Sequence, residues 1–116
     1  MNECVIIINN PYFTWVPPLN GDIKICVDQF LSRSNTDSIV HVCMDKCKRP
    51  TYCNDYIIPA LFTFLCGKKV NLYKHFNSPE SNIVHVNSPV KFYFTDENNR
   101  VLKENTPIIR CKISYI

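Results

Sequence analysis

Short stretches of this chain alternate between apolar and polar or small side chains with a period of two residues. Ile23, Ile25 and Val27 form the clearest case, and their spacing predicts a strand with one face against a core. Similar β-branched and aromatic runs recur along the chain, separated by clusters of Asn, Asp, Ser and Pro. The predicted strands are residues 5–8, 12–16, 23–27, 39–44, 57–66, 70–73, 83–86, 90–95 and 108–115.

Between seven and nine short strands with turn residues between them predict an all-β fold. We expect one domain over residues 1–116, an antiparallel β-sandwich with a jelly-roll-like architecture. Residues 57–66 are apolar enough for a short buried helix, but Pro59 and the β-branched and aromatic content favour a strand. No stretch has a convincing amphipathic helical pattern.

Two segments have strong turn signals. Asn20, Gly21 and Asp22 predict a tight turn, because Asn and Gly tolerate a positive φ. Residues 96–100 are rich in Asp, Glu and Asn and could suggest a calcium loop. They lack the alternating ligands and the final bidentate Glu of an EF-hand, so we expect a solvated hairpin turn there.

Composition and charge narrow the function classes. The chain is 46% apolar and 20% charged, which argues against disorder, and its net charge of +3 is too small to predict nucleic-acid binding. No apolar run approaches the roughly 18 residues that span a bilayer. No basic region precedes the apolar residues 5–8, so we expect no signal peptide and an intracellular location.

Catalytic signatures are missing from the sequence. With only 2 glycines, at positions 21 and 67, no Gly-rich phosphate loop can form, and there is no G-x-S-x-G elbow. No local motif selects a Cys–His pair from the cysteines and histidines. We therefore expect neither an enzyme nor a small-molecule substrate.

The chain has 7 cysteines, and an odd number cannot all pair within one molecule. Four of them, Cys26, Cys43, Cys66 and Cys111, lie inside apolar runs, where a free cysteine behaves as a small buried hydrophobe. Burial of free thiols is the first interpretation.

A zinc site is the second interpretation of these cysteines. The sequence indicates no other cofactor. His41, Cys43, Cys47 and Cys53 fall within 13 residues, and His41 and Cys43 would share one face of a strand. The sequence lacks the C-x2-C pair of a zinc knuckle. A disulfide between Cys47 and Cys53 is an alternative under oxidising conditions.

Candidate contact residues lie in a basic loop and on an aromatic strand. Lys48, Arg49 and Tyr52 belong to the basic loop at residues 46–54, which we expect to be solvated rather than bound to nucleic acid. Phe92 and Phe94 would share the core face of a strand and Tyr93 would point away from it. Apolar character on both faces of one strand suggests either a position at the centre of the sandwich or a buried subunit interface.

Five segments of the C-terminal two-thirds together resemble a known family. They are Ile39–Asp45, Pro59–Leu65, Phe76–Val86, Val90–Leu102 and Pro107–Ile113. Their order is similar to that in the C-terminal half of minor capsid (penton-like) proteins of Polinton/Maverick elements and related animal DNA viruses. The similarity covers residues 39–116. It implies a non-enzymatic structural role in a particle vertex and transfers no catalytic residue.

Two function hypotheses follow. The first is a viral or mobile-element structural protein that assembles with identical subunits and other structural proteins. The second is a small intracellular binding module, with or without zinc, that recognises a host protein through loops at residues 33–38 and 46–54.

Overall fold

The protein folds as two facing β-sheets in a computed structural model that describes residues 3–31, 38–45, 51–53, 55–66, 73–75 and 81–116. Eleven strands are assigned in these ranges. They are β1 (Glu3–Ile8), β2 (Tyr12–Trp15), β3 (Gly21–Leu31), β4 (Ser38–Met44), β5 (Thr51–Cys53), β6 (Tyr56–Ile58), β7 (Ala60–Cys66), β8 (Tyr73–His75), β9 (Ser81–Val86), β10 (Val90–Thr95) and β11 (Ile108–Tyr115). Within the described ranges, no helix is long and apolar enough to cross a membrane.

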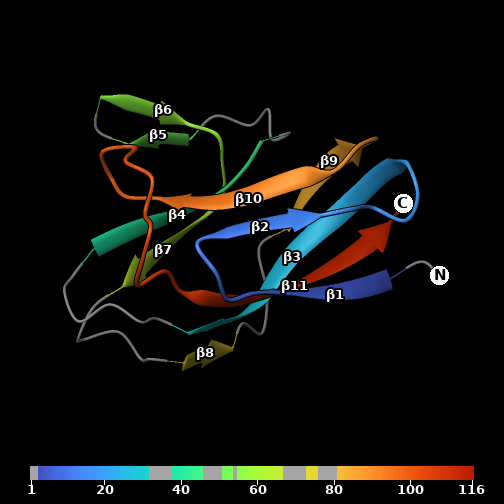
Figure 1. The fold of residues 1–116 in the computed structure, drawn as a ribbon, viewed down its shortest axis with the longest axis horizontal. Helices are drawn as coiled ribbons and strands as arrows, with labels where there is room; N and C mark the ends of the chain where they lie inside the picture. The colour runs from blue at the N-terminus through green and yellow to red at the C-terminus, as the bar shows by residue number, and fades with distance from the viewer. Residues whose placement is uncertain (1–2, 32–37, 46–50, 54, 67–72, 76–80) are drawn as a thin grey trace.

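The pairing of the strands is nested, as expected for a jelly roll. The first sheet has the order β1-β11-β3, followed by β8 and β9, which both pair with β3. The second sheet has the order β2-β10-β4-β7, and β5 pairs with β6 in a separate hairpin (Figure 1). From the ends of the chain inward, β1 pairs with β11, β2 with β10, β3 with β9 and β4 with β7. All these pairs are antiparallel, and the expected all-β jelly-roll-like sandwich is confirmed.

The core lies between the two sheets and is filled by the alternating apolar residues. Ile23, Ile25 and Val27 on β3 are buried, as their spacing predicts, and so are Phe92 and Phe94 on β10. These residues belong to one cluster that draws on strands of both sheets. The burial of one face of strands such as β3 and β10 explains why the period-two pattern located them.

An aromatic pair bridges the two sheets. Phe30 on β3 and Phe64 on β7 stack with their ring centroids 4.5 Å apart and an interplanar angle of 17°. Phe30 is almost completely buried. Because β3 belongs to the first sheet and β7 to the second, this pair ties the layers together at one end of the sandwich.

Strand β3 is longer than the alternation predicted, because a bulge interrupts its regular pattern. It continues to Leu31, and its register with β11 shifts so that Arg110 faces Gln29 while Cys111 faces Val27. Asp28 is the extra residue of the bulge, and its carboxylate forms an ion pair with Arg110. The sequence predicted a strand of residues 23–27 because alternation is lost at this bulge.

The predicted strand at residues 57–66 is two strands. Pro59 lacks a backbone N–H and separates β6 from β7, which supports the prediction of strand over helix but divides the segment. This division adds one strand to the upper limit of nine that the sequence predicted. In addition, β5 lies in a segment read as a loop, and β8 and β9 share one edge of β3.

The two predicted turns have different outcomes. Gly21 has a φ of 146°, but the segment before it carries the chain from the second sheet to the first, so it does not close a hairpin. Asp96 begins a tight turn in which its carboxylate accepts hydrogen bonds from the backbone N–H groups of Asn98 and Arg100, both at 2.9 Å. Asn99 supplies the positive φ of 59°. This turn closes on a bridge between Thr95 and Val101, and β11 then joins the other sheet.

Candidate functional site

The outer face of the second sheet carries the strongest candidate for a functional surface. Val90, Phe92 and Phe94 of β10 point into the core, so the residues between them point outward. The register places the outward Tyr93 directly opposite Tyr12 on β2 on one side and Cys43 on β4 on the other. We call Tyr12, Tyr93 and the neighbouring Val101 the aromatic face.

Charge distinguishes the outer faces of the two sheets. On the first sheet the outward positions of β1, β3, β9 and β11 include Glu3, Asp22, Lys24, His85, Arg110 and Lys112. Of the described outward residues on the four strands of the second sheet, only Lys91 is an acid or a strong base. A sheet face with so little charge and with an exposed tyrosine, Tyr12, has the composition of a contact surface rather than of a solvated surface.

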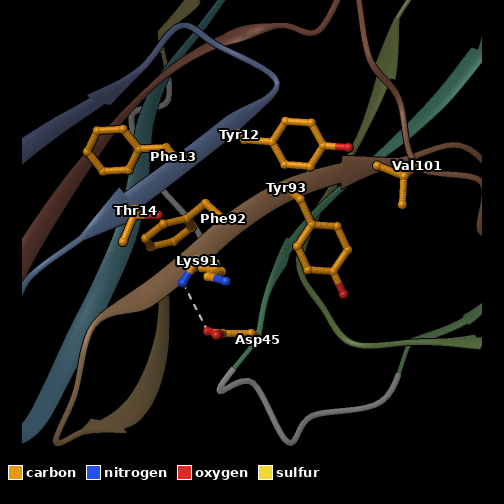
Figure 2. Close-up of a pocket in the computed structure, with 8 residues that line it drawn as sticks. All are labelled: Tyr12, Phe13, Thr14, Asp45, Lys91, Phe92, Tyr93 and Val101. Carbon is orange, nitrogen blue, oxygen red and sulfur yellow. Dashed lines mark hydrogen bonds between the residues drawn. The ribbon is translucent and has the colours of Figure 1, made fainter.

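A pocket of about 310 Å3 opens on this side of the molecule (Figure 2). Its lining is mostly apolar and comes from β2, β10 and the segments that follow β4 and β10. The lining residues are Tyr12, Phe13, Thr14, Asp45, Lys91, Phe92, Tyr93 and Val101. The volume is at the lower end of the range for ligand sites and suits a single large side chain or a small ring.

The polar end of the pocket is fixed by the backbone. The Asp45 carboxylate accepts a hydrogen bond from the Lys91 backbone N–H at 3.0 Å, and the Asp45 N–H donates to the Lys91 carbonyl at 3.1 Å. The second of these bonds extends the backbone ladder between β4 and β10 by one residue past Met44, and the first adds a side-chain bond at the same pair. Figure 2 shows Asp45 beside Lys91 at this end of the pocket, while the Tyr12 and Tyr93 rings and Val101 lie toward the other end.

The β5–β6 hairpin extends the apolar surface. A small second core of Cys43, Ile58 and Ala60 lies on the outer side of the second sheet, and Cys53 and Tyr93 pack against it. Tyr52 and Ile57 are paired across the hairpin and are both well exposed. Tyr93 therefore contacts both the pocket and the base of the hairpin, and it links the two parts of the surface.

The histidine and cysteines proposed for zinc are partly brought together. His41 and Cys43 lie on the same strand, β4, and both are buried, while Cys53 packs against the cluster that contains Cys43. Cys53 is a free thiol, and Cys47 lies outside the described residues. Among the residues that are described, no three His, Cys, Asp or Glu side chains gather closely enough to hold a metal ion. Zinc binding remains a prediction that depends on Cys47.

His41 has an unusual environment for an ionisable group. Its Nδ1 is 2.8 Å from Thr63 Oγ1, and its Nε2 is buried without a hydrogen-bond partner among the described residues. Burial lowers the pKa of His41 below its ordinary value, and the negative charge of Asp96 offsets this effect only in part. The ring is therefore neutral at physiological pH and adds no charge to this side of the sheet.

The predicted contact residues have separate outcomes. Tyr93 lines the pocket, and Tyr52 is exposed on the hairpin, whereas Lys48 and Arg49 lie outside the described residues. Tyr12, Asp45 and Val101 were not predicted. The alternation of β2, in which Trp15 is buried and Tyr12 exposed, was a usable signal for Tyr12. No local sequence pattern indicates Asp45 or Val101, because each reaches the pocket only through the pairing of its segment with β10.

Comparisons with known proteins identify no relative of this chain. No known family, no curated protein and no solved structure matches it. The resemblance of residues 39–116 to minor capsid proteins therefore stays a hypothesis drawn from the residues themselves.

Proposed function

We propose that the protein is a non-enzymatic structural subunit of a viral or mobile-element particle, of the minor capsid or vertex type. It works by contacts with copies of itself and with other structural proteins of the particle. The observation that carries the proposal is the aromatic face, an outer sheet surface with exposed tyrosine and almost no charge. A particle or the interior of its host cell is the location that this role requires.

The chemistry of the aromatic face favours association. Tyrosine is enriched in protein interfaces, because its ring supplies a large apolar area and its hydroxyl can still find a hydrogen-bond partner. Tyr12 is 59% exposed and lines an apolar pocket. One side chain of a neighbouring subunit could therefore fill the pocket and cover the Tyr12 ring at the same time. Exposed apolar side chains scattered singly need no explanation, but a connected set beside a pocket does.

The jelly-roll-like fold of the protein also suits assembly. Jelly rolls occur in viral capsid proteins, where two packed sheets give a rigid body with defined faces. The same architecture also serves lectins and other proteins, so the fold alone does not select a function. The resemblance of residues 39–116 to minor capsid proteins supports the choice of a particle subunit.

A small binding module is the second candidate. The pocket of about 310 Å3 favours it, since a recess of this size can accept one anchoring side chain of a host protein. In that case the chain would be a monomer, and the partner would bind across the pocket and the β5–β6 hairpin.

Mass in solution separates the two candidates. Light scattering on the purified chain, from one to tens of micromolar, should give a mass above 13.5 kDa that rises with concentration if the chain self-assembles. A constant mass of one chain over the whole range would contradict the structural-subunit proposal and leave the monomeric binding module as the better account.

A further inference from the structure

Strand β1 is an open edge of the first sheet. All six residues from Glu3 to Ile8 pair with β11 in unbroken antiparallel register, and among the described strands β11 is its only neighbour. Every second residue of an edge strand directs its backbone N–H and C=O away from the sheet. The edge of β1 is therefore a row of hydrogen-bonding groups that can pair with another strand.

The other edges differ from β1 in ways that discourage pairing. Strand β2 has four residues and lies between Pro11 and the Pro17–Pro18 pair. Strand β7 starts directly after Pro59, and its ladder with β4 is irregular between Val42 and Cys43. The edge beyond β3 is divided between the short strand β8 and β9. Prolines, bulges and short strands are common protections of sheet edges, and β1 has none of them.

The side chains of β1 are almost all apolar. Ile6 and Ile8 are buried in the core, while Val5 is 44% exposed and Ile7 56% exposed on the outer face. The only charged residue of the strand is Glu3, at its start, and its carboxylate is 2.8 Å from the Lys112 ammonium. Residues 4–8 thus form an uncharged, regular edge of five residues.

We propose that β1 pairs with β1 of a second copy of this chain, in antiparallel orientation about a two-fold axis at Ile6. Residues opposite each other must point to the same side of the sheet, so the two residue numbers must have an even sum. An axis at Ile6 places Val5 opposite Ile7 of the second copy and Cys4 opposite Ile8. An axis at Val5 would instead place the charged Glu3 opposite Ile7.

A second copy is the occupant that fits this edge. Two identical strands in antiparallel orientation are related by a two-fold axis, so one surface patch can complete itself without a different partner. With the axis at Ile6, all five opposed pairs are apolar, and Glu3 keeps its contact with Lys112 outside the paired segment. The outward Val5 and Ile7 of both copies would then form one apolar cluster of β-branched side chains.

Two matched substitutions test the pairing. Val5 lies opposite Lys112 on β11, and Ile83, which is 69% exposed, lies opposite Lys24 on β3. Val5→Glu and Ile83→Glu therefore place a carboxylate on the same face of the same sheet, each opposite a lysine, but at opposite edges. Both are made in a chain that carries Tyr12→Ser, so that association through the aromatic face does not affect the result.

The measurement is mass by light scattering at tens of micromolar. The Tyr12→Ser parent and its Ile83→Glu variant should have twice the single-chain mass of 13.5 kDa. Val5→Glu should raise the dissociation constant of the dimer at least about tenfold, because its carboxylate would be buried opposite Ile7 of the second copy. Ile7→Glu, opposite Arg110, is a second variant with the same expected effect.

Hydrogen exchange gives the structural readout. The backbone N–H groups of β1 that point to the open edge should exchange more slowly in the parent than in the Val5→Glu variant. A monomeric parent would overturn the proposal, as would a dimer that survives both Val5→Glu and Ile7→Glu. A dimer weakened equally by Ile83→Glu would also overturn it. Because Tyr12 is already replaced, none of these results decides whether the aromatic face mediates assembly.

Discussion

Tyr12 on β2 and Tyr93 on β10 lie directly opposite each other on the outward side of the second sheet. One residue along each strand, Phe13 and Phe92 form the corresponding pair on the other side, with their ring centroids 6.1 Å apart. Phe92 is buried, whereas Tyr12 is largely exposed. The β2–β10 pair therefore presents aromatic rings to both sides, and only one side is covered by the core of this molecule.

The first prediction concerns the exposed ring. Tyr12→Ser should weaken self-association by about 2 kcal/mol, or about 30-fold in the dissociation constant, because a buried interface tyrosine is a typical hot spot. The stability of the subunit should change little, since the ring is not part of the core. Sedimentation or light-scattering titrations would measure the effect, in a chain that carries Val5→Glu so that pairing through β1 does not contribute. Ile83→Ser, at an exposed position of the first sheet and away from the pocket, is the matched control.

The second prediction tests the contact between the sheets. Phe30→Ala should reduce the free energy of unfolding by about 3–5 kcal/mol, because it removes a buried ring that stacks on Phe64 and leaves a cavity. Denaturant titration followed by the fluorescence of Trp15 would measure the change. Ile83→Ala, at an exposed position, should stay within about 0.5 kcal/mol of the parent. Equal losses in the two variants would contradict the assigned core.

The third prediction concerns pH. Burial lowers the pKa of His41 in the folded state, whereas the unfolded chain binds a proton at its ordinary pKa near 6.5. As the pH falls below about 6.5, the unfolded state gains protons that the folded state does not, so stability falls. His41→Gln should remove this contribution, and its free energy of unfolding should change less between pH 7 and pH 5. Parallel pH profiles for the two chains would count against a buried neutral His41.

The fourth prediction orders four of the five described thiols by reactivity. Cys43 and Cys111 are buried, and burial, with smaller effects of Asp28 and Cys26, strongly raises the pKa of Cys111. Cys26 and Cys53 are half-buried, so maleimide should modify them at least about tenfold faster than the buried pair. Peptide mass spectrometry after short labelling pulses would give the rates. Rapid labelling of Cys111 in the native protein would be inconsistent with its place in the core.

Much of the fold could be predicted from residue alternation alone. The period-two pattern of residues 23–27 and 90–95 located two strands and assigned Phe92 and Phe94 to the core and Tyr93 to the outside. This works because β3 and β10 each direct one face into the core, so the local sequence records the position of the core. Pro59 and the bulge at Asp28 break that pattern, and the predicted strand limits were wrong at both places.

The candidate site was less accessible to prediction, because it depends on pairing between distant segments. Tyr12 meets Tyr93, and Asp45 meets Lys91, only through the registers of β2 and β4 with β10. A sequence shows which side of a strand a residue takes, but the choice of neighbouring strand follows from the global topology. The asymmetry of charge between the two outer faces likewise becomes visible only after the strands are assigned to sheets.

The central claim is that the aromatic face is covered when subunits assemble. Hydroxyl-radical footprinting, carried out on dilute and on concentrated protein, measures this cover residue by residue. The account predicts that modification of Tyr12 slows as concentration rises, while modification of Ile83, exposed on the other sheet, keeps the same rate. If Tyr12 is modified at one rate at every concentration, the aromatic face is not an assembly surface and the proposed function is contradicted.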